Sequence, residues 1–371
     1  MDTSAADIEG AQPPESSAQR GPGRRAESLW AVSWRKLRRN KPALIGMYTI
    51  VLFVLVALFA PLISPHHPNQ QILEYAIKPM MFRGAILLQS NPANPNEPLA
   101  LPILSYTVQG DSVHYFSGNA GDPEESVIAA ADLAGDGPED WYDEPLYVCG
   151  TDRFGRDIFS RILAGARISI SVGIFSQFIA LTIGMLLGAL AGYFRGRTDD
   201  VILWLINVVW SFPFILLVIV FSVILGEGWW QTFTAIGLVA WVEIARIVRG
   251  QIFSLRETEF VGAARALGFS DARIILRHIL PNTIGPVMVL VTAGFANAII
   301  AEAGLSFLGL GVQPPDASWG QMINDGRGYI SAGVGWELIV FPSLAIAAAV
   351  FAFNVFGDGL RDALDPRLIE K

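Results

Sequence analysis

Long apolar segments constrain this chain more than any other feature of its sequence. A helix that spans a bilayer needs about 20 predominantly apolar residues. Five segments come close to or exceed that length, and a sixth is shorter and contains Glu243 and Arg246. Apolar residues make up 52% and charged residues 16% of the chain, away from the usual balance of soluble proteins. We therefore predict an all-α polytopic membrane protein with six transmembrane helices, at residues 44–63, 168–192, 201–225, 233–248, 285–307 and 338–356.

Basic residues predict how these helices are oriented. Lys and Arg gather before the first span, between spans two and three, between spans four and five, and after span six. The positive-inside rule places these segments in the cytoplasm, and six spans return the C terminus to that side. We expect a multi-pass protein of the plasma (inner) membrane with cytoplasmic N and C termini.

The chain divides into four predicted parts. Residues 1–27 have the composition of a disordered cytoplasmic tail. Residues 28–65 hold a basic amphipathic helix, suited to the membrane interface, and the first transmembrane helix. Residues 66–150 form an acidic extracytoplasmic insertion, and residues 151–371 form a core with five transmembrane helices and a cytoplasmic loop at 257–282.

The insertion is too long for a plain connector. Residues 103–108 and 112–116 alternate in polarity around Gly110 and Asp111, which predicts a β-hairpin and a small, partly β subdomain. Because the insertion is rich in carboxylates, nucleic acid is not an expected partner. The single cysteine, Cys149, cannot form an intramolecular disulfide and is interpreted as a small apolar residue.

No metal site is predicted in this insertion. Asp132, Asp136, Gly137 and Asp143 have some spacings of a calcium loop, but Ala134 stands where a ligand oxygen is needed. A solvated acidic loop is the preferred interpretation. The adjacent histidines at 66 and 67 lack a nearby Cys or third His, so we interpret them as an interfacial pair.

The cytoplasmic loop at 257–282 has the pattern of two short helices joined by a turn. Residues 263–267 favour helix, and Gly268 suits the left-handed position after a helix end. Ser270 or Asp271 can cap a second helix, which Pro281 is expected to end. Such a projection suits docking into a groove of a soluble partner. Its apolar face is expected to hold Phe260, Ala264, Leu267, Ile274 and Ile275.

Small residues and prolines mark special positions in the spans. Gly184, Gly188 and Gly192 recur every four residues, which allows helices to approach closely in a bilayer. This stripe could pack within the subunit or against a second subunit. Pro213 and Pro342 are expected to kink or break their helices.

Polar residues inside the spans are candidates for function. Glu302 and Asn297 could face a translocation path, where Glu302 would contact a substrate amine. Alternatively, Glu302 could bond to Ser306 or to backbone of a neighbouring helix, and we favour this structural role. Glu243 and Arg246 are three residues apart and could pair on one helical face.

Four stretches of sequence carry a resemblance to a known family. They are GTDRFGRD at 150–157 with Ser160 and Arg161; AARALG at 263–268 through RHILPN at 277–282; EAGLSFLGLG at 302–311 with Pro314, Pro315 and SWG at 318–320; and GDGLRDALDPR at 357–367. Together they resemble the inner-membrane permease subunits of ABC importers, specifically the C-type subunit of dipeptide, oligopeptide and nickel uptake systems. The resemblance runs from about Ser28 to Arg367, apart from the insertion.

The resemblance implies a type I ABC importer permease fold and a set of partners. These are a second homologous permease subunit, two ABC ATPase subunits, an extracytoplasmic substrate-binding protein and membrane lipids. The loop after the fourth span would form the coupling helix that docks on an ATPase subunit. The residues implied in this docking are Ala263, Ala264, Arg265, Leu267, Gly268 and Pro281.

The implied function is peptide transport by alternating access, with the translocation path shared between the two permeases. The chain has no Gly-Lys pair, and hence no phosphate-binding P-loop, so we do not expect it to be an enzyme. ATP and magnesium would bind to the ATPase subunits, and no cofactor to this chain.

Three alternatives remain open from the sequence. The same machinery could carry nickel or another small solute. A stand-alone secondary transporter would need paired intramembrane charges or inverted repeats, and no convincing repeat is present. A membrane-anchored enzyme would need a nucleophile–base set or a metal cluster in residues 66–150.

Overall fold

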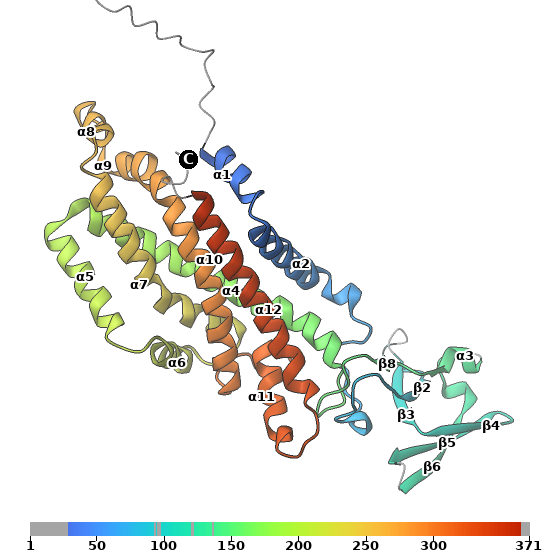
Figure 1. The fold of residues 1–371 in the computed structure, drawn as a ribbon. Helices are drawn as coiled ribbons and strands as arrows, with labels where there is room; N and C mark the ends of the chain where they lie inside the picture. The colour runs from blue at the N-terminus through green and yellow to red at the C-terminus, as the bar shows by residue number, and fades with distance from the viewer. Residues whose placement is uncertain (1–28, 93, 95–97, 120–121, 136, 365–371) are drawn as a thin grey trace, which may run out of the picture.

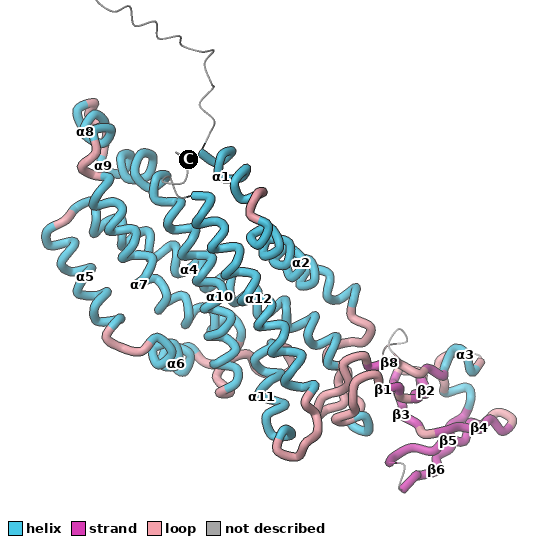
Figure 2. The backbone as a smooth tube through the Cα atoms, viewed as in Figure 1, coloured by secondary structure: helices cyan, strands magenta, loops and turns pink. Residues whose placement is uncertain are grey.

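A bundle of long helices carries a small β-rich insertion at one end (Figure 1). The computed structural model describes residues 29–92, 94, 98–119, 122–135 and 137–364. The helices α8 and α9, the start of α1 and the end of α12 lie at the end of the bundle opposite the strands (Figures 1 and 2). The predicted cytoplasmic tail at 1–27 lies outside the described residues.

Long helices make up most of the bundle. Five stretches among the described residues are long and apolar enough to cross a membrane. Helices α5 and α6 pass the same test only when they are taken together, and the pair is bent by 92° at its break. The predicted fold of membrane-spanning helices is therefore confirmed with five candidate spans, or six if the bent pair is one span. The bundle helices are α1 (Leu29–Leu37), α2 (Lys41–Ile63), α4 (Ile158–Phe194), α5 (Gly196–Trp210), α6 (Phe214–Leu225), α7 (Trp229–Leu255), α10 (Leu280–Phe307) and α12 (Glu337–Leu364).

Shorter helices lie at the two ends of the bundle. Two precede α10 at the end where α7 finishes, and the others lie toward the insertion (Figure 1). The short helices are α3 (Pro138–Trp141), α8 (Glu259–Ala266), α9 (Asp271–Arg273) and α11 (Trp319–Ile330).

The two prolines predicted to disturb helices behave differently. Pro213 lies in the break between α5 and α6, where its ring fixes φ and removes a backbone donor. Pro342 does not break α12, which continues through it. It lies in the second turn of that helix, so only one intrahelical hydrogen bond is lost.

Helices α4 and α7 approach each other closely in the bundle. A Cβ atom added at Gly188 would lie 2.5 Å from the backbone oxygen of Ala245, and one at Gly192 would lie 2.7 Å from that of Arg249. One added at Gly184 would lie 2.7 Å from Cβ of Ile244. The glycine stripe therefore packs within this chain. Because it is buried against α7, the first of the two alternatives, packing within the subunit, describes it.

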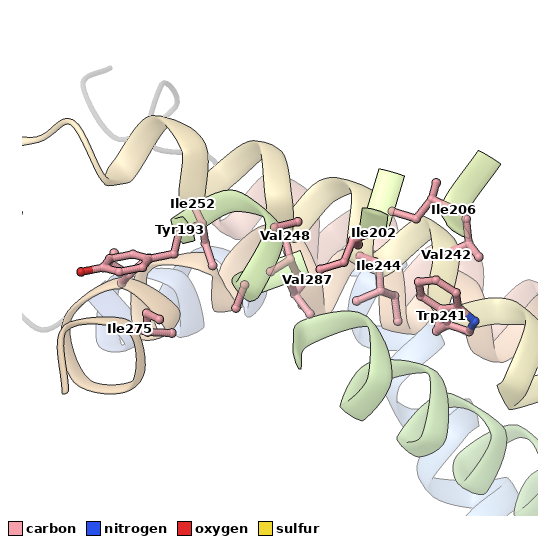
Figure 3. Packing of buried hydrophobic residues seen from close by; sticks show 14 of the residues in the cluster. Tyr193, Ile202, Ile206, Trp241, Val242, Ile244, Val248, Ile252, Ile275 and Val287 are labelled. Atoms are coloured by element: carbon pink, nitrogen blue, oxygen red, sulfur yellow. The ribbon is translucent and has the colours of Figure 1, made fainter. Parts of the chain in front are cut away.

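The α4–α7 contact continues into the largest group of buried apolar side chains. Val248 and Ile252 of α7 lie in it beside Tyr193 of α4, Ile202 of α5 and Val287 of α10 (Figure 3). Ile275, which lies between α9 and α10, packs into the same group (Figure 3). The segment after α8 is therefore fixed to the bundle core.

The insertion is a β-rich unit, as predicted. Its strands are β1 (Phe82–Arg83), β2 (Ala85–Gln89), β3 (Leu99–Ile103), β4 (Ser105–Gln109), β5 (Ser112–Asn119), β6 (Asp122–Ala129), β7 (Tyr142–Asp143) and β8 (Leu146–Tyr147). They form three antiparallel sheets in the orders β1-β8, β3-β2-β7 and β4-β5-β6. The predicted hairpin is present as β4–β5, with Gly110 at φ +60° in its turn. Asp136 of the calcium-like spacing lies outside the described residues.

The glycine stripe yields a stability prediction. Gly188→Leu should destabilise the folded chain by about 1–3 kcal/mol, because the new side chain meets the α7 backbone at a distance that only glycine allows. The matched control is Gly250→Leu on α7, where an added Cβ meets nothing within 4 Å. Thermal unfolding of the purified proteins in detergent measures the difference. Equal melting temperatures for the two variants would contradict the α4–α7 contact.

Candidate functional site

The projecting end of the bundle is a helix followed by a left-handed turn. Helix α8 ends at Ala266, and Gly268 has φ +75°, as predicted for the residue after the helix end. Ser270 precedes α9 in extended conformation but makes no side-chain capping bond. The hydroxyl of Tyr193 on α4 donates a 2.5 Å hydrogen bond to Asp271, which fixes the turn to the bundle.

The second helix of this loop does not end at Pro281. The chain stays helical from Asp271 to Phe307, and Pro281 lies inside this helical run, at the second residue of α10. The segment Ile274–Ile279 just before it is π-helical. In this π-helical segment the backbone hydrogen bonds span five residues instead of four, and the segment ends two residues before the proline. The predicted helix–turn–helix is therefore a helix and turn that lead into span five.

Only part of the predicted apolar face of this loop is exposed. Leu267 is 73% and Phe260 is 43% exposed, whereas Ala264 is 4% exposed and packs into the bundle core. Ala264 is thus not available to a partner, because Val261 and Ala264 form the inward side of α8. Ile274 and Ile275 are buried too. The other predicted docking residues lie on the exposed side: Ala263, Arg265, Gly268 and Pro281.

Glu302 is buried in a hydrogen-bond network within the bundle. Its carboxylate accepts hydrogen bonds from Ser306 Oγ at 2.8 Å and from Ser169 Oγ at 3.2 Å. Ser306 in turn accepts from Ser318 Oγ at 3.4 Å and from the backbone of Val312 at 3.2 Å. Glu302 and the three serines are fully buried.

This network joins α4, α10 and the start of α11. Trp319 adds to it, since its backbone N–H donates to Ser169 Oγ at 3.4 Å and its ring N–H donates to the carbonyl of Ile162 at 3.0 Å. A buried polar group without partners is costly, so these bonds hold the 308–318 loop in one arrangement. Glu302 does not face a path in this structure. It bonds to Ser306, as the favoured structural interpretation of the sequence proposed.

Asn297, in contrast, lines a pocket of about 680 Å³. Helices α4, α6, α7 and α10 and the α5–α6 break surround this pocket, and Glu243 lines it as well. No ion pair joins Glu243 to Arg246 in the described part of the chain, contrary to expectation. Arg246 lies over the ring of Trp210 instead, with Cζ 3.4 Å from the ring centroid. The pocket is therefore the place where polar side chains of the spans are open to a ligand.

A buried ion-pair cluster lies at the end of the bundle that carries the insertion. Asp152 Oδ2 is 2.6 Å from Arg156 Nε and 3.6 Å from Arg161 Nε. Asp325 of α11 is 3.4 Å from Arg156 Nη2 and 3.1 Å from Arg153 Nη2. Asp152, Arg156 and Arg161 are at most 3% exposed and Asp325 is 6% exposed. The cluster joins the segment before α4 to α11.

From the sequence, the arginines of this cluster were noted only as part of the stretch at 150–161, and Asp325 was not identified. The available signal was three arginines within nine residues next to a span, since arginines that become buried need carboxylate partners. Nothing in the sequence shows which distant acid supplies them.

The N-terminus of α4 is fixed by Asp157. Its carboxylate accepts from Ser160 Oγ at 2.6 Å and lies 3.3 Å from Nδ1 of His66, which stacks on Tyr147. Burial disfavours the charged form, yet the contact with His66 and the hydrogen bonds from Ser160 hold the pKa of Asp157 below its ordinary value. The nearby Cys149 is buried, and burial raises the pKa of its thiol to about 11.

Comparison with known proteins places this geometry in context. A family model described as "Binding-protein-dependent transport system inner membrane component" matches residues 184–370. A second model, for the N-terminal TM domain of oligopeptide transport permease C, matches residues 28–81.

Curated relatives align over most of the chain. The dipeptide transport system permease protein DppC of Bacillus subtilis (strain 168) is 35% identical, over 91% of this chain and 85% of that protein. The oligopeptide transport system permease protein OppC of the same strain is 35% identical, over 92% and 90%. The glutathione transport system permease protein GsiD of Escherichia coli O6:K15:H31 (strain 536 / UPEC) is 36% identical, over 91% of each chain.

The ion-pair cluster yields a second stability prediction. Asp325→Ala should cost on the order of 3 kcal/mol, because it leaves Arg156 buried with one partner fewer. Glu227→Ala is the control, since Glu227 is exposed and has no hydrogen bond or ion pair among the described residues. The readout is the thermal unfolding midpoint of each purified variant. An Asp325→Ala protein that melts with the wild type would rule out a stabilising role for this cluster.

Proposed function

Because this chain belongs to the family of inner membrane components of binding-protein-dependent transport systems, we propose that it is a permease subunit of an ATP-driven peptide importer. It would pair with a second homologous permease, and the two would open the path alternately to either side of the membrane. The observation that carries this proposal is the exposed face of α8 at the end of a bundle whose polar pocket lies deeper inside.

The exposed side of α8 is suited to docking on an ATPase subunit. Leu267 and Phe260 present apolar surface, and Arg265 presents a charge. The inward side is fixed to the bundle through Val261, Ala264 and the bond from Tyr193 to Asp271. A push on α8 would therefore move α4 and α7 with it. ATP and magnesium would bind to the ATPase subunits.

Peptides are the proposed substrate class, supplied by an extracytoplasmic binding protein. The relatives are named for dipeptide, oligopeptide and glutathione transport, and the pocket has a size typical of small-ligand sites. Nickel or another small solute is the second candidate, which uptake assays with each solute distinguish. A chain that transports peptide in liposomes without ATPase subunits would be a secondary transporter instead.

Orientation can be tested with single cysteines. We expect α8 and both chain ends to be cytoplasmic, because basic residues gather at that end. In a Cys149→Ala background, Asp111→Cys in the β4–β5 turn should react with a membrane-impermeant maleimide in intact cells. Arg197→Cys at the start of α5 should react only after permeabilisation. Labelling of Arg197→Cys from outside would reverse the proposed orientation.

The role of α8 can be tested at Gly268. Gly268→Val should reduce transport several-fold and uncouple ATP hydrolysis from substrate, because valine at φ +75° costs about 1–2 kcal/mol and misdirects α8. Gly268→Asn is the matched control at the same exposed position, since asparagine tolerates the left-handed region. Transport and ATPase activity are measured in proteoliposomes with the assembled complex.

Leu267→Asp tests the exposed face itself, by placing a charge in the apolar docking contact. It should weaken co-purification of the ATPase subunits. If Gly268→Val and Leu267→Asp both support wild-type transport, α8 is not the coupling element.

A further inference from the structure

The pocket of about 680 Å³ holds three polar side chains that have no partner. Glu243 of α7, Gln177 of α4 and Asn297 of α10 line it. None of the three makes a hydrogen bond or ion pair with any other residue that the structure describes. Three helices thus place polar groups around one space, where Glu243 and Asn297 are exposed and Gln177 is buried. Glu243 stands in the middle of α7.

Gln177 is the least expected of these groups. It is only 4% exposed, yet it lines the pocket and makes no hydrogen bond with any described residue. A Cβ atom added at Gly294 would lie 2.3 Å from Oε1 of Gln177, so the amide lies directly over the bare backbone of α10. The absence of a side chain at position 294 is what allows this amide to reach the pocket.

The α5–α6 break supplies the wall that faces these groups. Trp210, Phe212 and Phe214 on either side of Pro213 line the pocket. Irregular backbone at membrane depth is tolerated only where protein covers it or where it lines a hydrated cavity. The pocket therefore combines an aromatic wall, two free amides and one free carboxylate. It has no cationic side chain in its lining.

This combination selects a ligand with a positive charge and amide groups. A carboxylate in a low-dielectric site favours a cation that can donate hydrogen bonds, and side-chain amides pair with the N–H and C=O groups of a peptide bond. We propose that this pocket binds the amino-terminal end of a peptide in transit, with Glu243 on the protonated terminal amine and Gln177 and Asn297 on the first peptide bonds. The inference rests on the proposed transport of peptides.

The site is tested by direct peptide binding, without the binding protein. The complete complex of this chain with its partner permease and ATPase subunits is purified, and binding of radiolabelled trialanine is measured by equilibrium dialysis. Glu243→Gln should weaken trialanine binding about tenfold or more, because a charge-assisted hydrogen bond is lost. Glu243→Asp should recover part of the loss. N-acetyl-trialanine should compete at least tenfold less well than trialanine for the wild-type complex.

The matched control is Glu227→Gln, an exposed carboxylate outside the pocket lining, which should leave binding unchanged. Gln177→Leu is a second variant inside the pocket and should also weaken binding. Equal trialanine affinity of the wild type and Glu243→Gln, or no binding by the wild type, would overturn the inference. So would loss of the partner permease from the Glu243→Gln complex, since Glu243 would then pair with that subunit.

Uptake of trialanine by the wild-type complex with its binding protein is measured in parallel. If that uptake occurs while binding is insensitive to Glu243, only the pocket assignment fails. If no peptide is taken up, the proposed function fails and the pocket assignment fails with it.

Discussion

The backbone contact between α4 and α7 is the constraint on which the rest of this molecule depends. Three glycines on α4 bring it against α7 at distances that allow no side chain. With no hydrophobic driving force between helices in lipid, such close packing supplies much of the association energy. Helix α4 is 37 residues long and reaches both ends of the bundle. It therefore joins α8 at one end to the ion-pair cluster at the other.

Polar side chains inside the bundle are of two kinds in this chain. The Glu302–serine network and the Asp152–Asp325 cluster are satisfied internally and fix particular segments. The pocket side chains are unsatisfied and open to a ligand. A sequence shows only that a polar residue stands in an apolar run, so both kinds look alike until the neighbouring helices are placed. The sequence therefore named both Glu302 and Asn297 as candidates for the path, although only Asn297 lines the pocket.

The sequence predicted the fold well because the length of an apolar segment is a local signal. It predicted the β4–β5 hairpin and the left-handed Gly268 for the same reason. The sequence could not predict features that depend on tertiary contacts. The side of α8 that Ala264 faces depends on Tyr193 and Ile275, and the partner of the glycine stripe depends on α7. Pro281 was misinterpreted because the π-helical segment that precedes it leaves no mark in the sequence.

The Asp325 contacts also set an order for synthesis. Arg153 and Arg156 leave the ribosome about 170 residues before the acid that pairs with them. Until α11 has been made, the segment before α4 holds guanidinium groups that its own acids only partly balance, and it cannot settle into its final buried form. A chain cut short before residue 325 therefore lacks the acid that pairs with these arginines, and the end of the bundle beside the insertion stays unfinished.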